Sequence, residues 1–188
     1  IYGSAWRYRH RARLSVREVA KKGTVLVGFH EKRSSFIADM KSCEILPKRV
    51  SDLLVPLREL INSLSLRKKL PQIELAVTDE ALALVLRVLE KPTADDEAKL
   101  RQFQKDYGVD FWYQPKGPDS IYPMDPENAA RLKLHHRETG VEVVFRPTDF
   151  TQVNHRLNEV MVTRALRLLH LEPSSKVIDF FCGLGNFT

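Results

Sequence analysis

Residues 177–188 combine apolar side chains, an acid and two glycines in a spacing that suits ligand binding, Val-Ile-Asp-Phe-Phe-Cys-Gly-Leu-Gly-Asn-Phe-Thr. Residues 176–181 predict a buried strand. Gly183 and Gly185 predict a tight turn at its end, where the backbone can approach a ligand closely. In open α/β sheets, ligands bind at the carboxyl ends of the strands. The segment therefore predicts a nucleotide-type binding loop.

Two common phosphate-binding loops do not fit this spacing. A dinucleotide fingerprint G-x-G-x-x-G that starts at Gly183 needs a third glycine at position 188, which is Thr188. A P-loop needs a lysine followed by serine or threonine after its last glycine, and the segment has none. A strand and turn without any ligand is the structural alternative at this point.

The loop and the segment before it resemble a known family. D-x-x-C-G-x-G-x-F-T, which starts at Asp179, resembles the first S-adenosylmethionine motif of the RNA (uracil-5-)-methyltransferases. Residues 150–154, Phe-Thr-Gln-Val-Asn, followed by Asn158, resemble the F-x-Q-x-N segment that precedes this motif in the family. The distance between the two segments also fits the family.

Two earlier segments extend the resemblance to nearly the whole chain. Residues 9–15, Arg-His-Arg-Ala-Arg-Leu-Ser, resemble the basic strand that opens the family's central domain. Residues 39–46 resemble the V-x-x-C-x-I-L segment that supplies the fourth cysteine of a 4Fe–4S cluster, here Cys43. Because members that methylate transfer RNA typically lack the cluster, Cys43 favours the branch that methylates bacterial 23S ribosomal RNA.

The resemblance implies roles for individual residues. Phe150 would stack on the flipped target base or form a wall of its pocket. Gln152 would hydrogen-bond the cofactor or the uracil edge, and Asn186 would bond the methionine end of the cofactor. Asp179 would orient the glycine loop by accepting hydrogen bonds from backbone N–H groups. The predicted S-adenosylmethionine site comprises Gln152, Asp179, Phe181, Gly183, Gly185 and Asn186.

The implied reaction is methylation of C5 of a uridine. A cysteine thiolate adds to C6 of the uracil, the resulting enolate takes the methyl group at C5, and a carboxylate removes the C5 proton before the cysteine leaves. In the family, this cysteine and base lie after the glycine loop, whereas an RNA-binding barrel and three cluster cysteines lie before residue 1. We therefore interpret the chain as an internal fragment, expected to be catalytically inactive alone.

An alternation of basic and apolar residues over 6–17 predicts a strand with an arginine-rich outer face. Arginine suits phosphate contacts, and no acid interrupts the run before Glu18. A solvated face with no RNA role is the alternative. The predicted RNA contacts are Arg7, Arg9, Arg11 and Arg13. The inward face would carry Trp6, Tyr8, His10, Ala12, Leu14 and Val16.

The two cysteines carry different expectations. By resemblance, Cys43 is a cluster ligand, although a lone cysteine is usually part of a core. Cys182 is expected to be a small buried residue of the loop and not a nucleophile. Neither implies a disulfide, and such sparse use of cysteine fits a reducing cytoplasm. His30, His135 and His136 show no metal-ligand spacing and are interpreted as surface or hairpin residues.

Periodicity predicts an α+β fold with a mainly antiparallel sheet for residues 1–147, followed by the start of a Rossmann-like α/β domain at 148–188. The boundary is placed near Pro147. The helix that starts at Asn154 or Asn158 is expected to bury Val160, Met161, Ala165, Leu168 and Leu169. Expected strands are 6–17, 24–30, 35–41, 72–78, 82–89, 109–113, 131–137, 141–145 and 176–181, and expected helices are 49–66, interrupted near Pro56, 94–107 and 154–170.

The bulk properties leave several functions open. A net charge of +6 with 43% hydrophobic residues fits a globular RNA-binding protein, and no apolar run reaches the roughly 20 residues of a membrane span. We expect a cytoplasmic monomer with ribosomal RNA as its partner. The alternatives are a transfer-RNA methyltransferase, a non-enzymatic RNA-binding module, and a dinucleotide oxidoreductase, which Thr188 disfavours.

Overall fold

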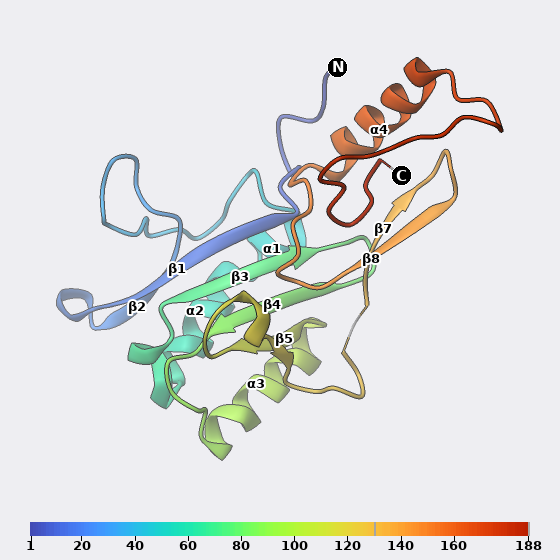
Figure 1. The fold of residues 1–188 in the computed structure, drawn as a ribbon. Coiled ribbons are helices and arrows are strands. Elements are labelled where there is room, and N and C mark those ends of the chain that lie inside the picture. The colour runs from blue at the N-terminus through green and yellow to red at the C-terminus, as the bar shows by residue number, and fades with distance from the viewer. Residues whose placement is uncertain (130, 188) are drawn as a thin grey trace.

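A six-stranded sheet forms the centre of the computed structural model, which describes residues 1–129 and 131–187 (Figure 1). The strand order is β2-β1-β3-β4-β5-β6, and neighbouring strands are antiparallel except for the parallel pair β4 and β5. The predicted α+β fold with a mainly antiparallel sheet is thus confirmed. The strands are β1 (Arg11–Val19), β2 (Thr24–Gly28), β3 (Gln72–Val77), β4 (Leu82–Arg87), β5 (Asp110–Gln114) and β6 (Tyr122–Pro123).

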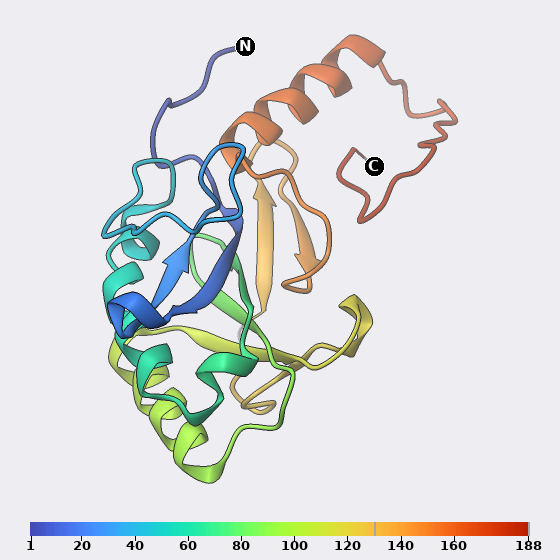
Figure 2. The ribbon, with the colours of Figure 1, turned by 90° about the vertical axis from the view of Figure 1, so that its left-hand side faces the viewer.

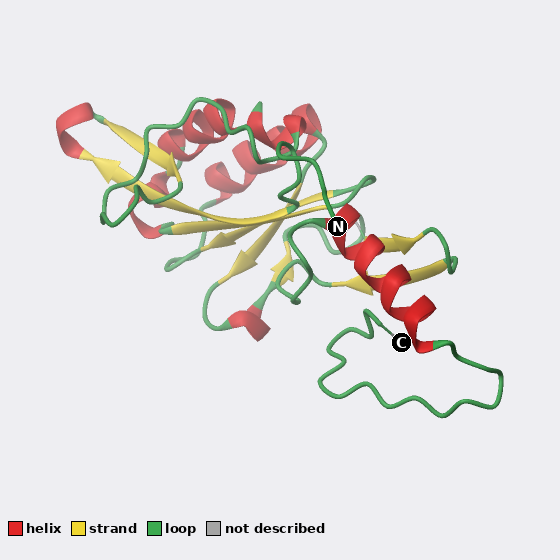
Figure 3. Ribbon diagram, turned by 90° about the horizontal axis from the view of Figure 1, so that it is seen from above, coloured by secondary structure: helices red, strands yellow, loops and turns green. Residues whose placement is uncertain are grey.

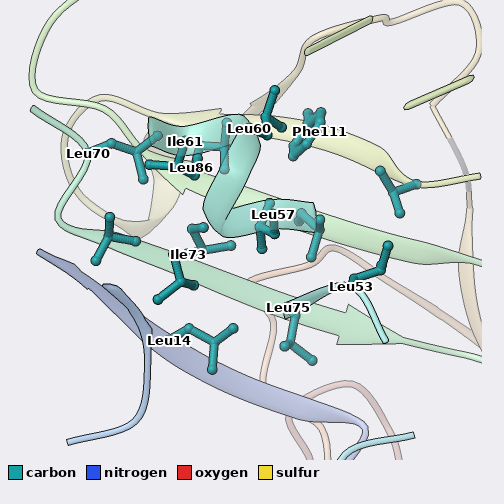
Figure 4. Close-up of a cluster of buried hydrophobic side chains, with 14 of the residues drawn as sticks. Leu14, Leu53, Leu57, Leu60, Ile61, Leu70, Ile73, Leu75, Leu86 and Phe111 are labelled. Carbon is teal, nitrogen blue, oxygen red and sulfur yellow. The ribbon is translucent and has the colours of Figure 1, made fainter. Parts of the chain in front are cut away.

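Helices cover one face of this sheet (Figure 3). Leu57 and Ile61 of α2 belong to the same apolar core as Leu14 and Ile73 from the sheet (Figure 4). The burial of such side chains is the main favourable term in folding. These helices are α1 (Lys48–Ser51), α2 (Leu54–Ser63) and α3 (Ala94–Tyr107), and short 3₁₀ turns occupy Ala20–Lys22, Ser65–Lys69 and Pro118–Ser120.

The expected interruption near Pro56 is confirmed. The helical pattern of 49–66 splits into α1 and α2, and Pro56 is the third residue of α2. Proline is tolerated in a first helical turn, where the backbone N–H has no partner within the helix. The helix of residues 94–107 is also confirmed, and Gly108 ends it with a left-handed φ of 61°.

A hairpin packs against the other face of the sheet. It consists of β7 (Leu132–His136) and β8 (Val141–Phe145), as predicted. Leu132, Leu134 and Phe145 form a second apolar cluster with alanines of the sheet, including Ala76 and Ala83. The last helix, α4 (His155–Leu169), extends beyond this hairpin, and the residues after it return toward β8 (Figure 2).

Two strand predictions near the amino terminus were wrong. β1 begins at Arg11 and not at residue 6, because Arg7 adopts a left-handed φ of 59° that interrupts an extended chain. Trp6, expected to point inward, is exposed, whereas Ala12, Leu14 and Val16 are buried as expected. Residues 35–41 contribute a single bridge, between His30 and Ile37, and no strand.

Two predictions near the carboxyl terminus were also wrong. The helix cap at Asn154 is confirmed, but Val160, Leu168 and Leu169 are exposed, and Asn158 and Val162 are buried instead. Residues 176–181 form no strand, and Val177, Ile178 and Phe180 are exposed. A strand needs a neighbour for its backbone hydrogen bonds, and none of the described strands pairs with this segment.

The buried carboxylate of Asp96 ties the start of α3 to the 3₁₀ turn after α2. Its oxygens accept hydrogen bonds from Ser65 N at 2.7 Å and Ser65 Oγ at 2.5 Å. Thr93 and Asp96 also form a reciprocal capping box. Burial opposes ionisation, but the hydrogen bonds from Ser65 and Thr93 outweigh it and hold the pKa of Asp96 below its ordinary value.

We predict that Asp96→Ala lowers the free energy of unfolding by about 2–4 kcal/mol, because it removes a cap and charge-assisted hydrogen bonds together. Urea denaturation at neutral pH measures the loss. Asp95→Ala is the matched control, because Asp95 is exposed and pairs with Lys99 on the helix surface. Its loss should stay near 0.5 kcal/mol. Equal losses in the two variants would contradict the anchoring role of Asp96.

Candidate functional site

The glycine loop has the backbone conformation that its sequence predicts. Gly183 and Gly185 have φ values of 60° and 79°, which favour glycine, and Gly185 N donates to Cys182 O at 3.0 Å to close a turn. Phe181 also has a positive φ, of 62°, and its ring is fully exposed. The loop therefore directs an aromatic side chain outward from a tight turn.

A reciprocal pair of amides holds this loop against the first turn of α4. Asn158 Nδ2 donates to Asn186 Oδ1 at 2.7 Å, and Asn186 Nδ2 donates to Asn158 Oδ1 at 2.9 Å. Asn158 is only 3% exposed, so its polar groups depend on this partner. The sequence analysis assigned Asn158 only to a motif and a possible helix cap, and did not predict that it would hold the loop.

The loop and residues 149–152 line one pocket of about 320 Å³. Among the predicted site residues, Phe150, Gln152, Phe181, Gly183 and Asn186 come together in its wall. Asp179 and Gly185 are described but do not line it. The other lining residues are Leu134, Val143, Asp149, Thr151, Cys182, Leu184 and Phe187.

Sequence reasoning missed two contributions to this pocket. The β7–β8 hairpin supplies Leu134 and Val143, which no motif identifies. Thr151 is buried, and its Oγ1 has no hydrogen-bond partner among the residues that the structure describes. Apolar walls with a few orienting polar groups are typical of small-molecule sites. A buried hydroxyl without a partner is the kind of signal that sequence cannot give.

Asp179 does not have all the partners expected of it. Its Oδ2 is buried, and no donor within the described part of the chain reaches that oxygen. The expected loop-orienting bonds of Asp179 are thus not seen at this atom. Cys182 is exposed, so the expectation of a small buried cysteine was wrong. The loop has no covering layer at Cys182, which leaves its thiol accessible.

Two of the predicted RNA-binding arginines have partners within the protein. The Arg7 guanidinium donates to the carbonyl oxygens of Cys43 at 2.9 Å and Leu46 at 3.2 Å, and pairs with Glu44. Arg11 Nη2 lies 2.7 Å from Glu74 and also donates to Pro147 O. These two side chains therefore hold loops in place. This arrangement differs from the open arginine face that the alternation predicts.

The other two arginines differ from each other. Arg13 is exposed and lies 3.3 Å from a carboxylate oxygen of Glu74, so part of its charge faces solvent. Arg9 Nε is buried without a partner among the described residues, and the Arg9 backbone N–H donates to Ile45 O at 2.9 Å. An RNA contact at Arg9 or Arg13 remains a prediction.

Cys43 lies on a well-anchored loop. Its N–H donates to Ser51 Oγ at 2.8 Å, and its half-buried side chain packs against the main core. Cys43 and Cys182 are both free thiols. Over residues 1–129 and 131–187, no group of three or more potential metal ligands comes together. The two described cysteines could supply at most two of the four thiolates of a cluster.

Known proteins resemble the chain over its full length. It is 59% identical, over all 188 residues, to the 23S rRNA (uracil(1939)-C(5))-methyltransferase RlmD of Burkholderia lata, and 57% identical to RlmD of Cupriavidus necator. The chain spans 40% and 42% of the length of these two relatives. No family profile matches it. The resemblance predicted from the sequence is confirmed.

A solved structure shares the fold of the chain. The Pyrococcus abyssi tRNA (uracil-54, C5)-methyltransferase in complex with S-adenosyl-L-homocysteine matches 98% of the chain with a TM-score of 0.70. The match covers 46% of that protein at 18% identity. At this identity the likeness supports the fold alone. Within the described residues, no helix is long and apolar enough to cross a membrane.

Two stacked histidines join the start of α4 to the residues before β1. The rings of His10 and His155 lie 4.4 Å apart at an angle of 19°, and His10 N donates to Val153 O at 2.7 Å. Burial, together with the nearby charges of His10 and Arg11, lowers the pKa of His155 to about 4 against the opposing effect of Asp79. His155 is therefore neutral at physiological pH.

We predict that the protein loses stability as the pH falls from 6.5 toward 4. Below pH 6.5 the unfolded chain protonates His155, whereas the folded chain takes up this proton only near pH 4. His155→Gln removes this contribution, so its unfolding free energy should fall less between pH 7 and pH 5. Urea midpoints of both proteins at the two pH values test this. Parallel pH dependences would refute the assignment, because all other titrating groups are shared.

Proposed function

We propose that the chain is part of an S-adenosylmethionine-dependent methyltransferase that methylates C5 of a uridine in 23S ribosomal RNA. The observation that carries the proposal is the meeting of Phe150 and Gln152 with the glycine loop in one pocket. These residues lie about 30 positions apart, and the resemblance assigns both segments to the same reaction site. Identity of 57–59% to RlmD over the whole chain supports the same reaction and substrate.

The proposal also covers the domain organisation. We infer a central α+β domain over residues 1–147 and the start of a Rossmann-like methyltransferase domain over residues 148–188. Both apolar clusters of the described residues end at or before Phe145, apart from isolated contacts of α4. A helix, an apolar segment and a glycine loop follow, in the order that opens such a domain.

The residues of the pocket fit S-adenosylmethionine, which would supply the methyl group when bound. Phe181 offers an exposed ring for the apolar parts of the cofactor, and Asn186 offers a fixed amide. Thr151 Oγ1 is a buried polar atom with no partner in the described part of the chain. A Cβ placed on Gly183 would meet nothing within 4 Å, so its left-handed φ, and not crowding, explains the glycine.

The reaction needs groups that we place outside these 188 residues. The nucleophilic cysteine, the carboxylate base and three cluster cysteines would come from the rest of a protein as long as the Burkholderia lata relative, 40% of whose length the chain matches. Within the chain, Phe150 would hold the flipped base by stacking, and Gln152 would bond its polar edge. The chain alone should therefore be inactive.

We expect the full-length protein to transfer a labelled methyl group from S-adenosylmethionine to unmodified 23S ribosomal RNA. Mass spectrometry of the digested RNA should find the label in 5-methyluridine. Label in transfer RNA alone would reassign the substrate, and no label with bound cofactor and RNA would favour a non-enzymatic module. Detectable transfer by residues 1–188 alone would refute the assignment of the nucleophile to the rest of the protein.

A variant tests the cofactor pocket through its affinity for S-adenosylmethionine. Asn186→Ala removes one amide of the pair and a pocket contact, so S-adenosylmethionine should bind about tenfold more weakly, as expected for one or two lost hydrogen bonds. Calorimetry on the full-length protein measures the affinity. Asn128→Ala is the matched control, because exposed Asn128 bonds Asp125 outside the pocket. Equal affinities for both variants would remove Asn186 from the site.

We further propose that Cys43 is one ligand of a 4Fe–4S cluster in the full-length protein. Cys43→Ser should abolish or strongly reduce the visible absorption of the anaerobically purified protein, because thiolates hold such clusters. Cys182→Ser is the matched control and should keep the spectrum. An unchanged spectrum in Cys43→Ser, or no visible absorption in the parent protein, would contradict the cluster assignment.

A further inference from the structure

A second, polar pocket lies beside the cofactor pocket. It encloses about 280 Å³ between the residues before β1, the β7 strand and the first turn of α4. Four cationic side chains line it, whereas only two described acids do. The cations are Arg7, Lys133, Arg137 and Arg156, and the acids are Asp79 and Glu159. The pocket is therefore suited to an anion.

Buried nitrogen atoms in the wall of this pocket have no partner. His136 is 7% exposed, and its Nε2 contacts no donor or acceptor in the described part of the chain. His155 Nε2 is unpaired in the same way. Buried polar groups are almost always hydrogen-bonded, so two orphaned imidazole nitrogens in one pocket point to a missing ligand. Each can donate an N–H to an anionic oxygen.

The start of α4 adds further donors. His155 and Arg156 are its first two residues, and both line the pocket. The Asn154 side chain caps Leu157 N, whereas the N–H groups of the first helical residues have no partner within a helix. Helix N-termini favour anions because their N–H groups and dipole point the same way. α4 has 15 residues, enough for a full dipole.

The cations of the pocket are not equally available. Arg7 bonds carbonyl oxygens, and Lys133 Nζ pairs with Glu142 at 2.8 Å. Arg137 and Arg156 are exposed, and neither guanidinium bonds another described residue. Arginine recognises phosphate through paired N–H groups. These two side chains are therefore the ones that can close on an incoming phosphate.

We propose that this pocket binds a backbone phosphodiester of the substrate RNA. The proposal rests on the proposed function, because it takes RNA as the substrate. The two pockets share Leu134, and the Asn158–Asn186 pair borders both. A phosphate next to the target nucleotide would thus be held while its base stacks on Phe150 at the wall of the cofactor pocket. Phosphate contacts position an RNA strand without reading its sequence.

The test measures binding of a 23S ribosomal RNA fragment to the full-length protein at several salt concentrations. Arg137→Gln combined with Arg156→Gln should weaken binding about tenfold at low salt and reduce the slope of log affinity against log salt by one to two. Arg131→Gln combined with Arg164→Gln is the matched control. Arg131 directly precedes β7 and Arg164 lies on α4; both are exposed, and neither lines the pocket. The control should change affinity less than about threefold.

Equal effects of the two double variants would overturn the proposal. Inorganic phosphate is titrated in parallel, because it carries the same chemistry. Micromolar phosphate binding with unaltered RNA affinity in Arg137→Gln/Arg156→Gln would also overturn it. Methyl transfer by the wild type distinguishes a failure of the phosphate pocket from a failure of the proposed function. If the wild type transfers methyl groups and the two double variants bind RNA equally, only the phosphate pocket is refuted. If Arg137→Gln/Arg156→Gln binds RNA more weakly than the control but the wild type transfers no methyl group, the pocket is supported and only the proposed function is refuted.

Discussion

The buried contact between Arg11 and Glu74 determines where the candidate site lies. Arg11 Nη2 is 2.7 Å from the Glu74 carboxylate, and the two side chains are 11% and 13% exposed. The same guanidinium also donates to Pro147 O and Asp149 O, which lie three positions and one position before Phe150. A buried ion pair adds little net stability, but loss of one partner leaves a costly unpaired charge. Arg11 therefore fixes the position of the linker relative to the sheet.

A series of polar contacts extends from this anchor to the glycine loop. His10 N bonds Val153 O, the Asn154 side chain caps the start of α4, and Asn158 pairs with Asn186. An apolar core, by contrast, ends near Phe145. Polar contacts are directional and apolar ones are not. A few defined hydrogen bonds thus position the pocket. Because its position does not depend on burying the rings of Phe150 and Phe181, these rings can stay exposed.

The sequence predicted the elements whose pattern is local. The helix at 94–107, the hairpins at 72–89 and 131–145, and the turns at Gly183 and Gly185 all depend on neighbouring residues. The convergence of Phe150 and Gln152 with Phe181 also followed from motifs. Sequence could not show which partners the arginines meet. Arg7 and Arg11 alternate as on an exposed face, yet they bond residues 36 to 138 positions away.

The failed predictions share a different cause. Apolar periodicity shows that a face is to be buried but does not say against what, and the described residues offer no cover for Leu168, Ile178 or Phe180. Contiguous exposed apolar surface usually marks an interface. Residues 176–181 have the composition of a central strand, and a central strand forms only between neighbours. The glycine turn needs no such neighbour, so it takes its shape even where the strand before it does not.

The arrangement of the two pockets gives a physical reason for placing a buried amide pair between them. Asn158 and Asn186 each use one N–H and the carbonyl oxygen on the other, so the pair is satisfied while Asn186 keeps its second N–H for a ligand. Thr151 Oγ1 on one side and His136 Nε2 on the other have no partner among the residues that the structure describes. The amide pair between the pockets therefore has its hydrogen bonds, while each pocket keeps a buried polar atom that no described residue pairs. That distribution lets each pocket select its own ligand, one largely apolar and one anionic, without disturbing the contact that separates them.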